Sequence, residues 1–160
     1  MGRYPYLKSF ERYSAKDFKM ALTSLARVGL SGFENRIIST LSEGEAARAA
    51  CACAITQDAP VILLDDPTSA LDTKHSIYLT SLIREFADEG RLVIISLHDV
   101  NLAMNHTDRL ILLKGGRVYG ETRSSMVDET VLGDLYGIPW EIWSAGGEGK
   151  LVAIPGSGYA

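Results

Sequence analysis

Two hydrophobic patterns, helical spacing and short continuous apolar runs, alternate along the chain and predict its helices and strands. Residues 15–28 have apolar side chains at helical spacing, with one face made of Phe18, Ala21, Leu22, Leu25 and Val28. Residues 42–57 are nearly all small or apolar, as in a helix buried on most sides. Residues 59–65 and 91–96 each contain a short continuous apolar run, which predicts two buried strands of a parallel sheet. A helix of residues 72–88, ended by Gly90, is expected between them.

The remaining third of the chain predicts shorter elements. Residues 108–121 read as two strands joined at Lys114, Gly115 and Gly116, which is a hairpin signal. A short helix is expected before this hairpin, at 99–107, and another after it, at 128–137. Residues 139–144 and 150–155 then predict a terminal hairpin. Alternating strands and helices indicate an α/β fold with a largely parallel sheet and flanking helices.

Three helix starts have recognisable N-caps. Ser14 followed by Asp17, and Ser42 followed by Glu45, have the spacing of capping boxes, in which each side chain bonds the other residue's amide. Asp72 precedes the third helix and is expected to cap it. These caps fix the predicted start of each helix.

Composition excludes several classes of protein. The chain has 160 residues, 46% hydrophobic and 22% charged, which is enough for one globular domain with its own core. A net charge of -4 argues against a nucleic-acid binder, because phosphate recognition normally requires a basic face. No run approaches the roughly 20 apolar residues of a membrane helix, and the first ten residues do not resemble a signal peptide. Cys51 and Cys53, two apart in a predicted helix, are expected to be reduced core residues of a cytosolic protein.

Candidate chemistry begins at the end of the first predicted strand, where Asp65 and Asp66 stand side by side before Pro67. Parallel sheets bind ligands at the carboxyl ends of their strands, so the pair predicts a divalent-metal site beside a reacting centre. The alternative is that both carboxylates are solvated and simply open a turn.

Four segments together resemble the ATP-binding subunit of an ABC transporter. "LSEGE" (41–45) is similar to the LSGGQ signature of that family, "VILLDD" (61–66) to its Walker B strand and "SALD" (69–72) to its D-loop. His98, after the second predicted strand, matches the H-loop. The segments follow the family's order and spacing. The resemblance implies a P-loop NTPase-like fold with a helical subdomain, and Mg²⁺ and ATP as ligands.

The signature implies a phosphate contact across a head-to-tail dimer. In the family, the signature of one subunit faces the γ-phosphate held by the other, and Ser42 and the amide of Gly44 at a helix start suit that role. Glu43 stands where glycine is usual, and its charge is expected to weaken anion binding. Glu45 stands where glutamine is usual, as a familiar variant. A purely structural capping role is compatible with both.

The other motifs imply roles around the same nucleotide. Asp65 would bind Mg²⁺, and Asp66 takes the place of the glutamate that polarises the attacking water, one methylene shorter. Ser69 and Asp72 of the D-loop would lie beside the nucleotide, and His98 would contact the γ-phosphate. The alternative for His98 is a strand-end histidine that caps the following helix.

The segments that precede the signature in the family have no match here. The GxxxxGK[ST] phosphate loop, the adenine-stacking aromatic residue and the Q-loop glutamine do not appear, so we expect an N-terminally truncated ABC ATPase domain without its first strands, inactive by itself. Residues 1–41 would be the remainder of the helical subdomain, 42–123 the core and 124–160 a C-terminal extension. His75 and His106 match no motif and are interpreted as surface residues.

The opening "GRYPYL" and residues 96–121 resemble most closely the importers of iron-siderophores, haem and vitamin B12. This implies a peripheral subunit on the inner face of the cell membrane that binds permease subunits and a second ATP-binding subunit. Two alternatives remain: a non-catalytic fragment that pairs with an intact subunit, and the C-terminal lobe of a split chromosome-maintenance or repair ATPase. The sequence does not identify the transported substrate.

Overall fold

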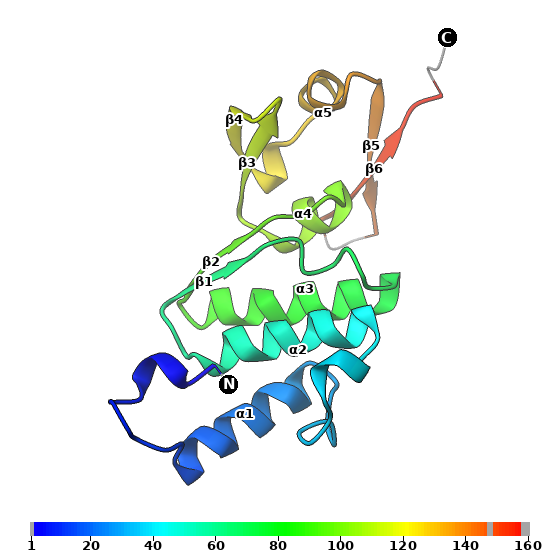
Figure 1. Cartoon of the computed structure of the whole chain (residues 1–160). Helices are drawn as coiled ribbons and strands as arrows, with labels where there is room; N and C mark the ends of the chain where they lie inside the picture. Colours follow the sequence, from blue (N-terminus) through cyan, green and yellow to red (C-terminus); the bar gives the residue numbers. More distant parts are fainter. Residues whose placement is uncertain (1, 147–148, 158–160) are drawn as a thin grey trace. The chain divides into compact units, whose positions relative to one another are not determined.

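The structure, a computed structural model, describes residues 2–146 and 149–157. The chain divides into two compact units, Met1–Leu97 and His98–Ala160, and each is described by itself. Figure 1 shows the elements along the chain. The first unit contains η1 (Tyr4–Tyr6), α1 (Ala15–Arg27), η2 (Ile38–Thr40), α2 (Glu43–Thr56), β1 (Val61–Leu64), α3 (Thr73–Asp88) and β2 (Leu92–Ile95). The second contains α4 (Val100–His106), β3 (Arg109–Lys114), β4 (Arg117–Arg123), η3 (Ser124–Met126), α5 (Glu129–Tyr136), β5 (Trp140–Ala145) and β6 (Lys150–Pro155).

All three predicted caps are present in the first unit. Ser14 and Ser42 are the N-caps of complete capping boxes at α1 and α2, and Asp72 caps α3 through the amide of His75. Gly90 follows α3 with φ 92°, a conformation that glycine adopts without a steric cost. The helix starts predicted from local sequence are therefore confirmed.

β1 and β2 form a two-stranded parallel sheet in the first unit. The register pairs Val61 with Leu92 and Leu64 with Ile95, and α2 and α3 lie along one face (Figure 1). Ile62 is buried toward these helices. The alternate side chains are exposed by about half to two thirds: Val61, Leu63, Leu92 and Ile94. The prediction of buried strands is thus correct for one face and wrong for the other, because the helices cover only one side of the pleat.

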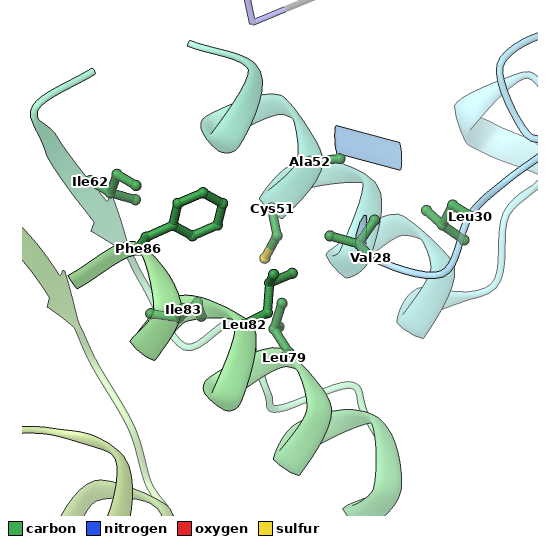
Figure 2. Close-up of a cluster of buried hydrophobic side chains, with 9 residues drawn as sticks. All are labelled: Val28, Leu30, Cys51, Ala52, Ile62, Leu79, Leu82, Ile83 and Phe86. Atoms are coloured by element: carbon green, nitrogen blue, oxygen red, sulfur yellow. The ribbon is translucent and has the colours of Figure 1, made fainter. Parts of the chain in front are cut away.

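The core of the first unit lies between α2, α3 and the covered face of the sheet (Figure 2). Phe86, from α3, is 2% exposed and Ile62 is 6% exposed. Cys51 points from α2 toward α3, and burial raises the pKa of its thiol to about 11 (Figure 2). Cys51 is therefore the predicted reduced core residue. Cys53 is also a free thiol but is exposed, so its predicted place in the core is wrong.

The buried face of α1 overlaps its predicted apolar face only in part. Phe18 and Leu22 are each exposed by about one half, whereas Asp17, Ser24 and Val28 are buried. These three positions are related by steps of seven and four residues, so they form one helical stripe, which shares Val28 with the predicted apolar face. Ser24 satisfies its hydroxyl by donating to the carbonyl of Met20. The periodicity therefore predicted correctly that Val28 is buried and that Leu25 packs against the core, and it was wrong for the exposed Phe18 and Leu22.

The second unit contains both predicted hairpins. β3 and β4 pair antiparallel around Gly115 and Gly116, which have φ 57° and 74°, as a tight hairpin turn requires. β5 and β6 also pair antiparallel, from Trp140 opposite Pro155 to Ala145 opposite Lys150. A second hydrophobic cluster fills this unit: Met104, Val127, Leu132 and Ala153. The chain therefore combines helices with parallel and antiparallel strands, in agreement with the predicted α/β class.

Candidate functional site

The start of α2 carries the residues of the predicted signature. The Ser42 amide donates to Glu45 Oε2 at 2.8 Å, and the Glu45 amide donates to Ser42 Oγ at 3.3 Å. The first of these bonds is the main cause of a lowered pKa at Glu45, so this carboxylate stays ionised. The box does not use the amides of Glu43 and Gly44, which belong to the same first turn. A helix start of this kind favours anions through its amides and dipole.

The D-loop lies directly against this helix start. A Cβ on Gly44 would stand 3.0 Å from the Ala70 carbonyl oxygen and 3.4 Å from Leu71 Cδ2, so this close approach depends on glycine. Both segments line one pocket of about 500 Å³: Ser42, Glu43, Gly44, Glu45, Arg48, Ala70, Leu71, Asp72 and His75. Five predicted site residues therefore come together in one unit: Ser42, Glu43, Gly44, Glu45 and Asp72.

Asp72 is fixed by the first turn of α3. Its Oδ1 accepts the His75 amide at 2.8 Å and lies 2.9 Å from His75 Nδ1. The backbone bond is the larger cause, and the ring the next, of a lowered pKa at Asp72. His75 has a side chain that is 38% exposed, as predicted for a surface residue, and it also lines the pocket beside Asp72.

His106, which was also predicted to lie at the surface, is less exposed than expected. It is partly buried at the end of α4, and desolvation lowers its pKa, with a smaller contribution from Lys150. Partial burial therefore favours its neutral form. It belongs to the second unit and is not among the residues that line the pocket.

Asp65 and Asp66 follow β1, as predicted. The Ser96 hydroxyl donates to Asp65 Oδ1 at 2.7 Å and accepts the Asp66 amide at 2.7 Å. Asp66 has φ 42°, in the left-handed region that aspartate tolerates better than longer side chains. Ser96 thus orients one carboxylate and anchors the backbone that carries the other.

Ser96 was not singled out from the sequence. The pairing of Leu64 with Ile95 places Asp65 opposite Ser96 one step further along the two strands. A hydroxyl residue directly after the neighbouring parallel strand was the available signal. It required the strand register, which the apolar runs alone do not determine.

Ser69 closes the turn that follows the carboxylates. Its hydroxyl donates to the Asp66 carbonyl at 3.0 Å, and its amide donates to the same oxygen at 3.4 Å. Pro67 and Thr68, between them, are buried. The turn that the alternative interpretation required is therefore real, and it links the carboxylates to the D-loop.

His98 begins the second unit and is exposed. The next residue, Asp99, is the N-cap of α4, and its Oδ1 accepts the amides of Asn101 at 2.8 Å and Leu102 at 3.1 Å. The alternative in which His98 itself caps this helix is therefore wrong, because Asp99 has that role.

The donor set at Asp65 and Asp66 fits Mg²⁺ brought by a nucleotide. Within residues 2–146 and 149–157, no group of three or more histidine, cysteine, aspartate or glutamate side chains could hold a metal ion. Mg²⁺ commonly binds through one or two carboxylates together with substrate phosphates. Asp65 is exposed and already oriented by Ser96, so it can supply such a carboxylate.

Residues 2–146 and 149–157 contain no helix long and apolar enough to cross a membrane.

Sequence comparisons identify relatives among import ATPases. The ABC transporter family model matches residues 5–69. The petrobactin import ATP-binding protein FpuD of Bacillus anthracis is 33% identical over 96% of this chain and 57% of its own length. The hemin import ATP-binding protein HmuV of Streptomyces coelicolor is 36% identical over 97% of this chain and 55% of its own. The phosphonates import ATP-binding protein PhnC 2 of Pseudomonas aeruginosa is 37% identical over 86% and 50%.

Solved structures agree. An inward-facing metal-chelate type ABC transporter superimposes with a TM-score of 0.84 at 23% identity, over 99% of this chain and 64% of that one, which shows the shared fold. The dimeric ATP-binding cassette MJ0796 bound to ADP and Pi matches with a TM-score of 0.65 at 33% identity, over 72% and 50%. The chain spans between half and three fifths of the length of the curated relatives named above. With its signature and D-loop around one pocket and its carboxylates at the end of β1, this chain belongs to the ATP-binding domain family of ABC transporters.

Proposed function

We propose that this chain supplies the signature, D-loop, Walker B and H-loop part of the ATP-hydrolysing subunit of an ABC importer. The observation that carries the proposal is the pocket in which Gly44 of the signature meets Ala70 of the D-loop. Such a pocket, with first-turn amides on one wall, suits the terminal phosphate of a nucleotide held by a second subunit. The family as a whole binds ATP with Mg²⁺.

The residues have separate roles in this proposal. Ser42 and the Gly44 amide bind the terminal phosphate, and Ser69 and Asp72 keep the D-loop in place beside it. Asp65 would hold the Mg²⁺ that arrives with ATP, an ion that would supply neutralisation of phosphate charge, and Asp66 would orient the attacking water. Ser96 is a positioning residue for both carboxylates, since its hydroxyl bonds the Asp65 side chain and the Asp66 amide. His98 contacts the terminal phosphate.

The proposed assembly is a head-to-tail pair of ATP-binding subunits on a membrane permease, at the inner face of the membrane. The dimeric cassette with ADP and Pi supports the pairing. For the cargo we propose a metal chelate such as an iron-siderophore, haem or a cobalamin, because petrobactin and hemin importers match along almost the whole chain. Phosphonate uptake is the competing outcome, since that relative is 37% identical, over a shorter stretch of 86% of this chain.

Hydrolysis can be tested by joining a family segment that contains GxxxxGK[ST] ahead of residue 1 and measuring Mg-dependent phosphate release. We expect activity that Asp66→Asn lowers about 100-fold, the usual contribution of a group that assists proton transfer. Asp58→Asn is the matched control. Asp58 also has a left-handed backbone, φ 54°, but its carboxylate pairs with Arg91 at the surface. Ser96→Ala should lower kcat about tenfold through loss of positioning.

The same assay distinguishes a truncated ATPase from a non-catalytic fragment that pairs with an intact subunit. Activity only when the unextended chain is mixed with an intact cassette would support the non-catalytic fragment that completes a partner's site. Equal activity of Asp66→Asn and Asp58→Asn would contradict the proposed role of Asp66. Uptake assays with iron-siderophore, haem, cobalamin and phosphonate, in cells that lack their own ATP-binding subunit, identify the cargo.

A further inference from the structure

The helix that follows His98 is too short to be stable by itself. α4 has seven residues, whereas isolated helices below about 12–15 residues are marginal in water. Its start is fixed locally, by Asp99 accepting the amides of Asn101 and Leu102. His98 lies between this cap and Ser96, whose amide donates to the Leu64 carbonyl at 3.0 Å, so its position depends in part on whatever anchors the body of α4.

Two asparagines anchor α4 to the terminal hairpin. Asn101 accepts the Ala153 amide at 2.7 Å and donates to the Ala153 carbonyl at 3.1 Å. Asn105 accepts the Leu151 amide at 2.9 Å and donates to the Leu151 carbonyl at 2.7 Å. Each carboxamide thus pairs with β6 as a peptide group of a neighbouring strand would. We call these four bonds the asparagine clamp.

The geometry of helix and strand explains why two asparagines fit. Residues four apart on a helix lie on one face and are separated by about 6 Å along its axis. Residues two apart on a strand present their backbone groups to the same edge and are separated by about 6.8 Å. Asn101 and Asn105 can therefore bond Ala153 and Leu151 together. The clamp occupies the edge of β6 that does not pair with β5.

Packing beneath the clamp joins the same elements. Met104 of α4 and Ala153 of β6 are buried in one hydrophobic cluster, together with Leu132 of α5. The hairpin is attached separately to α5, because the Ile142 amide donates to Glu129 Oε1 at 3.0 Å. β5–β6 is thus held by α5 on one side and holds α4 on the other.

We propose that the β5–β6 hairpin is a positioning element for His98, and that Asn101 and Asn105 are the positioning residues through which it acts. The inference rests on the proposed function, in which His98 contacts the terminal phosphate. Loss of the clamp would free α4 to shift, and His98 with it. A misplacement of about 1 Å at a reacting centre can cost about 100-fold in rate.

Two measurements test this. In the ATP-hydrolysing assembly, Asn101→Ala with Asn105→Ala should lower kcat at least tenfold and leave the KM for ATP within about twofold. In this chain without nucleotide, hydrogen exchange of the α4 amides should accelerate at least tenfold. Asn101→Asp alone is a milder second variant that keeps the acceptor and loses the donor, and it should give the same changes at smaller size.

Glu129→Ala is the matched control. It removes a hydrogen bond between the hairpin and α5 and does not touch α4, so faster exchange is expected in β5 with kcat unchanged. Faster exchange in α4 with an unchanged kcat would overturn the positioning role, as would unchanged exchange in both asparagine variants. Absence of hydrolysis in the unsubstituted assembly would instead overturn the proposed function, which makes the two failures distinguishable.

Discussion

The starts of α1 and α2 have the same local chemistry and different surroundings. Each opens with a serine N-cap and an acid three residues later, and both form complete capping boxes. At α1 the acid, Asp17, is buried and bonded by Arg3 Nε at 3.0 Å. At α2 the acid, Glu45, lies in the wall of a pocket that also contains the D-loop.

Arg3 closes the start of α1 from outside the helix. Its guanidinium also donates to the Gln57 carbonyl at the end of α2 and lies over the Tyr6 ring. The neighbouring Gly2 approaches α2 so closely that a Cβ would meet the Cys53 carbonyl oxygen at 2.1 Å. The start of α1 is therefore occupied by contacts within the protein, whereas the start of α2 lies in a pocket that a ligand can enter. Local sequence predicts a cap in both cases, and the tertiary contacts decide what the cap can do.

The largest difference is expected at the second helical position, which is Lys16 in α1 and Gly44 in α2. Helix propensity alone predicts that Gly44→Ala stabilises the protein by up to about 1 kcal/mol. The contact with the Ala70 carbonyl predicts displacement of the D-loop instead. We expect about a tenfold loss of ATP hydrolysis without a gain in melting temperature. Lys16→Ala should change neither, and a stabilised, fully active Gly44→Ala protein would contradict the close approach.

The two cap serines should show opposite patterns. Ser14→Ala should cost about 1–2 kcal/mol in the free energy of unfolding, because its hydroxyl also donates to the buried Asp17, at 2.7 Å from Oδ2. Ser42→Ala should cost about 0.5–1 kcal/mol at its exposed cap and, in addition, lower ATP hydrolysis. Urea unfolding and phosphate release, measured on both variants, check this. Equal losses of activity would mean that the two helix starts do not differ in function.

Lowering the pH should remove the stability that ionised Asp17 contributes at the start of α1. Hydrogen bonds from Ser14, then from Arg3, lower the pKa of Asp17 from its ordinary value of 3.8 to about 2. A lowered folded-state pKa gives stability that is present above about pH 4 and is lost as the pH falls toward 2. The free energy of unfolding should therefore fall over this window, and fall less in Asp17→Asn. Identical pH profiles would show that Asp17 is not the group that titrates.

Local sequence signals predicted the structure of this molecule better than the apolar periodicity did. Cap serines, glycines after helices and the Gly115–Gly116 turn each act within a few residues, and the elements they predict are present. The exposed face of β1 and β2, the exposed Phe18 and the pocket position of His75 depend on neighbours distant in sequence. Periodicity shows that a face is apolar and does not show what covers it.

The residues of the candidate site also fall into two groups, those within contiguous motifs and those that only tertiary contacts reveal. The motifs identified Asp65, Asp66 and the signature residues, because each motif is contiguous in sequence. Ser96 became visible only from the strand register, and the asparagine clamp only from the contact of α4 with β6. Groups that position other groups have no contiguous motif, so they are the part of a site that sequence alone reveals least.

The smallest effect is expected from Glu43, the first residue of α2. A carboxylate in the first turn stabilises a helix by about 0.3–1 kcal/mol through the dipole, and the same charge repels an anion at those amides. Glu43→Gln should therefore lower the free energy of unfolding by a few tenths of a kcal/mol and lower the KM for ATP about two- to fivefold. Ala15→Gln, at the equivalent position of α1, is the control, and it should leave the KM unchanged. A weaker affinity for ATP in Glu43→Gln would mean that the carboxylate assists nucleotide binding, and that the open start of α2 is not limited by its own negative charge.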